Sequence, residues 1–157
     1  MSIQIPNLHT SNKTSARVKA RVFIARRKDS LHAGEFTVQG NLSFNPATDD
    51  YPKATLTIRV DLSDSAKGTV VIKTVEQLDT TGKHTPTLFA SGRCSLDADV
   101  KAVGCRYWLM MADNKTDRDK ETPDVIGFLI FDRNGKRVAY GTGPLAQGDV
   151  LVAPTGE

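Results

Sequence analysis

The feature that most constrains the fold is a strict alternation of apolar and polar residues over positions 54–62. The apolar positions of this run are Ala54, Leu56, Ile58, Val60 and Leu62. A period of two places these side chains on one face of a β-strand and leaves the other face to water. A strand with one wet face is typical of an antiparallel sheet.

Composition favours strands over the rest of the chain as well. Sixteen Thr and thirteen Val stand against four Glu and four Gln, and β-branched side chains suit a pleated surface, whereas Glu and Gln usually fill exposed helix faces. No long segment carries an apolar stripe at helical spacing. The pattern predicts eight or nine strands, over 16–24, 35–44, 54–62, 69–78, 87–93, 105–112, 125–131, 137–142 and 149–152.

Two later strands, 105–112 and 125–131, are apolar on both faces. This predicts central strands between packed layers and places Trp108 in the core. The dipeptide Asn134-Gly135 supplies the two residues that a two-residue type I′ hairpin needs, so 125–132 and 137–142 should pair. Gly141-Thr-Gly143-Pro144 should then break the pairing.

Together these signals predict an all-β fold, an antiparallel β-sandwich of the jelly-roll or immunoglobulin-like kind, with a partly open barrel as the alternative. The length of 157 residues fits one domain. We expect an extended or flexible N-terminal arm over 1–14, the domain over 15–153 and a short tail over 154–157. No apolar run is long enough to span a bilayer and no secretory signal is recognisable, which indicates cytoplasmic synthesis and leaves the destination open.

Residues 90–152 have a cadence of strand and turn signals. It contains Ala-Ser-Gly-Arg-Cys from residue 90, Cys-Arg-Tyr-Trp-Leu-Met-Met from residue 105, the hairpin segment around Asn134-Gly135 and the closing Leu-Ala-Gln-Gly-Asp-Val-Leu-Val. This cadence resembles the β-sandwich modules appended to bacterial surface and secreted proteins, which end in a similar hairpin and a Gly-containing closing strand. The resemblance implies a sandwich with a binding or structural role.

No sequence motif indicates catalysis. The chain lacks the G-x-S-x-G elbow and both glycine-rich phosphate loops, and its three histidines (His9, His32 and His84) fall in the arm or in loops, where we expect them to face solvent. Most of the fourteen Asp residues occupy turns, so a hydrolase that uses paired carboxylates ranks last among the hypotheses. We therefore predict a protein that is not an enzyme and needs no cofactor.

Cys94 and Cys105 flank a predicted hairpin centred on 99–100, which would bring them opposite each other or one register step apart. A cross-strand disulfide is then geometrically allowed. The alternative is two buried free thiols, which the missing export signal favours.

The acidic segment 113–124 holds five carboxylates, but Lys115 stands where a calcium loop needs a ligand and no Gly follows at the sixth position. Lys115, Arg118 and Lys120 also neutralise the segment from within. We predict a solvated loop and no metal site.

The first sixty residues carry nine cations and four anions, a net charge of +5, so the remainder carries −2 within the total of +3. Alternation places Arg17, Lys19 and Arg21 on one strand face at intervals of roughly 6.6 Å, close to the spacing of phosphates in nucleic acid. The following loop extends this basic strip, whose members are Arg17, Lys19, Arg21, Arg26, Arg27 and Lys28. No aromatic residues interleave to stack bases, so protection of a sheet edge or a protein-facing patch is favoured over nucleic-acid binding.

The leading hypothesis is a structural, assembly or protein-interaction module, such as a homo-oligomeric subunit of a virion or filament. The arm 1–14 would add to a neighbouring sheet edge. The alternative is a module that binds a ligand, either carbohydrate or an anion such as nucleic acid.

Overall fold

The computed structural model describes residues 13–82, 84–98, 102–115 and 119–155, and these residues form ten β-strands and no helix. The strands are β1 (Lys13–Ile24), β2 (Gly34–Phe44), β3 (Lys53–Leu62), β4 (Gly68–Ile72), β5 (Gln77–Thr81), β6 (Thr87–Ala98), β7 (Ala102–Ala112), β8 (Val125–Phe131), β9 (Arg137–Pro144) and β10 (Gln147–Thr155). Every pairing between them is antiparallel. The predicted all-β antiparallel class is confirmed.

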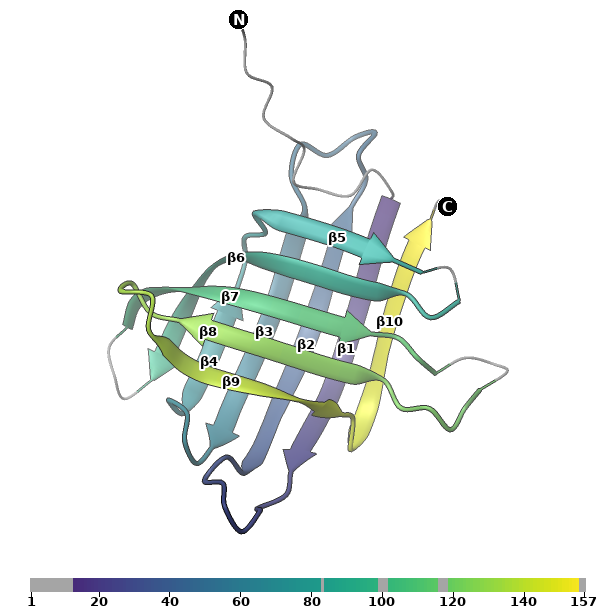
Figure 1. The fold of residues 1–157 in the computed structure, drawn as a ribbon. Helices are drawn as coiled ribbons and strands as arrows, with labels where there is room; N and C mark the ends of the chain where they lie inside the picture. Colours follow the sequence, from purple (N-terminus) through teal and green to yellow (C-terminus); the bar gives the residue numbers. More distant parts are fainter. Residues whose placement is uncertain (1–12, 83, 99–101, 116–118, 156–157) are drawn as a thin grey trace, which may run out of the picture.

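All ten strands belong to one hydrogen-bonded sheet, in the order β10-β1-β2-β3-β4-β6-β7-β8-β9, with β5 paired to β6 beside β4. The sheet curls so that the strands β5–β9 cross steeply in front of β10, β1, β2, β3 and β4 (Figure 1). The long strand β6 makes the corner, because Cys94 pairs with Ile72 of β4 while Ala90 pairs with Leu78 of β5. A sandwich of two separate sheets is not confirmed; the curled half-barrel is closer to the partly open barrel.

The core lies between the two halves of the curled sheet, and every strand contributes buried apolar side chains to it. In β1 and β3 alternate residues are buried, as the sequence predicts. Phe36 of β2 and Phe128 of β8 meet edge to face across the core, with ring centroids 4.8 Å apart. Aromatic pairs of this geometry stabilise the packing beyond the area that they bury.

Several predicted strand boundaries are wrong. The predicted strand 69–78 is two strands, β4 and β5, separated by residues 73–76. The glycine-rich segment 141–144 does not break the pairing but completes β9. A side chain on Gly141 would meet the rings of Phe36 and Phe128 at 2.8 and 3.0 Å, so this glycine makes room for the aromatic pair.

The domain limits also differ from those predicted. Residues 13 and 14, expected in the arm, begin β1, and residues 154 and 155, expected in the tail, end β10. The remainder of the predicted arm and tail, 1–12 and 156–157, lies outside the described residues.

Candidate functional site

Two rows of side chains cross the outer face of β5–β9. The register aligns Gln77, Ser91, Trp108, Leu129 and Tyr140 in the first row, and Asp79, Phe89, Met110, Gly127 and Thr142 in the second. These ten residues line a groove of about 460 Å³, here termed the aromatic groove. The outer face of this half of the sheet is therefore hollowed, and the lining of the hollow is largely apolar.

Gly127 leaves space in the floor of the aromatic groove. It lies between Met110 and Thr142 in the second row. A Cβ at this position would approach Oγ1 of Thr142 to 3.0 Å and the methyl carbon of Met110 to 3.7 Å. Any larger side chain at residue 127 would therefore stand in the groove.

The prediction that Trp108 lies in the core is wrong. Trp108 is 57% exposed and Phe89 on the neighbouring strand is 49% exposed. Strand β7 turns Tyr107 and Leu109 into the core instead, so alternation directs Trp108 outward. The sequence contains a signal for this, because the charged Arg106 is two residues before Trp108 and must share its face.

Two arginines flank the first row of the groove beside Ser91 and Trp108. Arg93 and Arg106 lie directly opposite each other on β6 and β7. Both contact Glu76, with Arg93 Nε 3.3 Å from Oε1 and Arg106 Nη1 2.9 Å from Oε2. The hydrogen bond from Arg106 and the charges of both arginines lower the pKa of Glu76, although partial burial opposes them. This arginine border carries two positive charges against one negative charge.

At one end of the first row, Tyr140 joins three elements. Its hydroxyl donates to Oδ2 of Asp64 at 3.0 Å, and its ring stacks on His32 with centroids 4.1 Å apart and lies 4.0 Å from the guanidinium carbon of Arg137. His32 also contacts the other carboxylate oxygen of Asp64 at 2.6 Å, and its side chain is only 15% exposed, so it is not the solvent-facing histidine that we predicted.

The titration of this cluster follows from its hydrogen bonds. Burial alone would raise the pKa of Asp64, but the hydrogen bonds from His32 and Tyr140 and the charge of His32 outweigh it and lower the pKa. The same hydrogen bond to Asp64 raises the pKa of Tyr140. The cluster fixes the wall of the groove at Tyr140 against the β1–β2 loop and the β3–β4 turn.

The strand residues of the basic strip lie in the other half of the curled sheet from the aromatic groove. Arg17, Lys19 and Arg21 share the outer face of β1, while 26–28 lie exposed in the β1–β2 loop. Arg21 is neutralised by Glu35, 3.2 Å away. Lys19 and Arg21 border a groove of about 400 Å³ that also includes Thr37, Gln39 and Gln147. Binding of an anion here stays a prediction.

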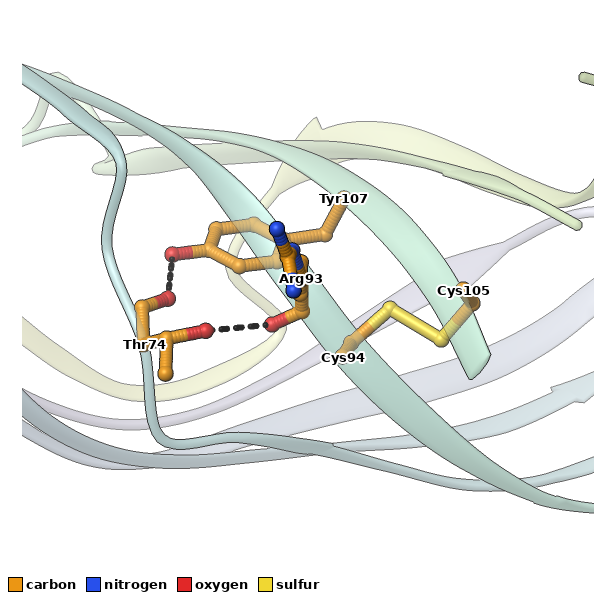
Figure 2. The surroundings of a disulfide bond; sticks show 5 residues. All are labelled: Thr74, Arg93, Cys94, Cys105 and Tyr107. Atoms are coloured by element: carbon orange, nitrogen blue, oxygen red, sulfur yellow. Dashed lines mark hydrogen bonds between the residues drawn. A yellow bond between two sulfur atoms is a disulfide. The ribbon is translucent and has the colours of Figure 1, made fainter. Parts of the chain in front are cut away.

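Cys94 and Cys105 are joined by a disulfide, the first of the two alternatives that the sequence leaves open. They are direct partners in the register, with Cα atoms 4.9 Å apart, and both are buried. Figure 2 shows the disulfide beside Tyr107, whose hydroxyl donates to the carbonyl of Thr74 at 2.7 Å. Thr74 in turn donates to the carbonyl of Arg93 at 3.1 Å. Burial, with the charge of Glu76, raises the pKa of Tyr107.

Two carboxylates of the acidic segment 113–124 accept hydrogen bonds from backbone N–H groups. Asp124 is only 3% exposed, and its carboxylate accepts the N–H groups of Asn114, Lys115 and Val150. Asp113 accepts the N–H group of Val152 at 3.1 Å. Among the described residues no cluster of His, Cys, Asp or Glu could hold a metal ion. Asp117 and Arg118 lie outside the described residues.

The described residues also form no helix that could cross a membrane. Comparison of the chain with family models, with curated proteins and with solved structures finds no match.

Proposed function

We propose that this protein is a non-enzymatic binding module and that its working surface is the aromatic groove. The observation that supports the proposal is the exposure of Trp108 and Phe89 on a hollowed sheet face. Large aromatic side chains left in water forgo the free energy that burial would provide, so a contiguous exposed apolar patch usually marks a binding surface.

The size and lining of the groove favour a compact, largely apolar ligand. About 460 Å³ falls within the range of roughly 300–1,000 Å³ typical of small-molecule sites. Polar side chains gather at the β5 side, where Gln77 and Ser91 share a hydrogen bond of 3.4 Å and Asp79 adds a carboxylate. A sugar would need polar partners along its whole length, so an apolar molecule fits this lining better than carbohydrate does.

Fluorescence titration with phenylnaphthylamine, a neutral apolar dye, tests the proposal. Trp108 is the only tryptophan of the chain. Dye bound in the groove should therefore fluoresce more brightly and should quench the emission of Trp108. Gly127→Leu should weaken binding by at least roughly tenfold, equivalent to about 1.4 kcal/mol, because the added side chain occupies the groove.

Two further variants keep this test decisive. Phe89→Ser, at an exposed position, should weaken binding without disturbing the core. Thr55→Leu adds the same side chain as Gly127→Leu to the outer face of β3, in the other half of the sheet, and should leave binding unchanged. The absence of saturable binding, or equal binding by all four proteins, would overturn the proposal.

Association of copies of this chain is the second candidate function, because Phe89 and Trp108 could pack against a second molecule. Native mass from light scattering over a range of concentrations tests it. A dimer or larger assembly that Phe89→Ser dissociates would support self-association. A monomer at all concentrations would exclude it.

A further inference from the structure

We propose that the ligand of the aromatic groove carries an anionic group, which the arginine border of Arg93 and Arg106 binds beside Trp108. The inference rests on the proposed function and adds the chemistry of the ligand: a compact ring system or short hydrocarbon body that bears one carboxylate, sulfonate or phosphate.

The register places the arginine border next to the groove. Arg93 comes two residues after Ser91 on β6, and Arg106 comes two residues before Trp108 on β7, so the two arginines lie side by side next to the first row. Side chains two residues apart on a strand share a face at roughly 6.6 Å. A ligand that covers Trp108 therefore ends within reach of both guanidinium groups.

The charge of the border is not balanced within the described residues. Glu76 supplies one carboxylate to two guanidinium groups. It contacts Nε of Arg93 and Nη1 of Arg106, so both Nη atoms of Arg93 and Nη2 of Arg106 take no part in these two contacts. Glu76 holds the pair in place, since like charges directly opposite on neighbouring strands would otherwise repel. One net positive charge and several N–H donors remain for an anion.

The donors are accessible, since the side chains of Arg93 and Arg106 are 76% and 59% exposed. The acid within the lining, Asp79, lies in the second row on β5 and not beside Trp108. An anionic group is therefore attracted to the side of the groove that Arg93 and Arg106 border and repelled from the side of Asp79.

A pair of dyes tests the inference directly. Anilinonaphthalene sulfonate has the ring skeleton of phenylnaphthylamine with a sulfonate added, so the ratio of their dissociation constants isolates the contribution of the anion. We expect the sulfonate to bind about tenfold more tightly at low salt, and this preference to shrink as sodium chloride screens the arginines. Arg106→Gln and Arg93→Gln should each reduce the preference and leave phenylnaphthylamine binding nearly unchanged.

Arg17→Gln is the matched control, because it removes the same charge from the outer face of β1, away from the groove. Equal affinity for the two dyes, a preference that survives in Arg106→Gln, or one that Arg17→Gln reduces as much, would overturn the inference while the proposed function stands. Failure of both dyes to bind would overturn the proposed function itself.

Discussion

At the scale of single residues, Asp124 stands out among the described acids because it is buried. Its Oδ1 accepts two backbone N–H groups at 2.9 Å and its Oδ2 accepts a third at 3.1 Å, while almost no surface of the residue reaches solvent. A buried carboxylate needs such donors to replace the water that it loses. Asp124 thereby ties the start of the β7–β8 loop to β10.

Asp124→Asn should destabilise the protein by about 2 kcal/mol, because the amide nitrogen would face an N–H donor where the carboxylate accepts. For a chain of this length the melting temperature should fall by roughly 4–8 °C. Asp50→Asn, at an exposed position in the β2–β3 turn, is the matched control and should change it little. Equal melting temperatures of the two variants would contradict the role of Asp124.

Replacement of Asp149 by asparagine should stabilise the protein, in contrast to the same replacement at Asp124. Burial and the neighbouring Asp124 carboxylate raise the pKa of Asp149. A carboxyl group whose pKa is raised by folding favours the folded state when protonated, and that contribution is lost as the pH rises through the raised pKa. Asp149→Asn should therefore stabilise the protein at neutral pH by up to about 1 kcal/mol. The gain should vanish near pH 4, about the usual pKa of Asp; a gain that persists in acid would contradict this.

Residue-scale properties were predictable from the sequence only where alternation decides them. The face of Arg17, Lys19 and Arg21 follows from a period of two. The face of Trp108 also follows from the charged Arg106 two residues before it, but the apolar residues on both faces of β7 pointed to a buried tryptophan instead. The partners of Asp124 were also hidden, since Val150 is 26 residues away in the chain.

At the scale of elements, the outer edge of β10 is closed by side chains. The N–H groups of Val150 and Val152, which point away from β1, are taken by the carboxylates of Asp124 and Asp113. An edge strand with open N–H groups can pair with another chain. These two carboxylates occupy donors that such a pairing would use.

A pair of substitutions at Asp113 tests the closure of this edge. Asp113→Ala removes the acceptor of Val152 and should accelerate exchange of that amide hydrogen by roughly fivefold, as expected for the loss of a bond of about 1 kcal/mol. Asp113→Asn retains an oxygen acceptor and should alter exchange much less. The amide of Ile58, in the middle of the sheet, is the internal control. Identical exchange of Val152 in both variants would contradict the assignment.

The division of the predicted strand 69–78 into β4 and β5 shows what an element-scale prediction lacks. The break at 73–76 is held by Tyr107, which donates to the carbonyl of Thr74, and by Ser91, whose carbonyl accepts the N–H of Glu76. Gly92 also permits the close approach, since a Cβ there would lie 2.8 Å from the Thr74 oxygen. These contacts come from β6 and β7, so the local pattern cannot reveal them.

At the scale of the whole molecule, the disulfide lies at the corner where the sheet curls. Cys94 is the β6 residue that pairs with the last residue of β4, just beyond the β5-paired part of the strand, and Cys105 is its partner on β7. The spacing of the two cysteines in the sequence indicated that they could meet. It could not reveal the corner, because the corner arises where β4 and β5 both pair with the long strand β6.

Reduction of the disulfide should lower the melting temperature while the strands persist. A cross-link over a sequence separation of 11 residues stabilises by about 2–3 kcal/mol in the chain-entropy account, or roughly 4–12 °C for a chain of this size. Melts of the same protein with and without reductant isolate the bond. The double variant Cys94→Ala/Cys105→Ala is the control and should not respond to reductant. Free thiols detected by labelling of the unreduced protein would contradict the pairing.

The pairing of β1 with β10 has a consequence for the order of the chain. Lys13 and Thr155 are direct register partners, and partners in an antiparallel pair have Cα atoms about 5 Å apart. A short peptide could connect these two positions, and new ends could open at the exposed turn between Asn134 and Gly135, with all ten strands keeping their neighbours. The arrangement of the strands thus does not depend on where the backbone begins. The protein should therefore tolerate circular permutation at this turn.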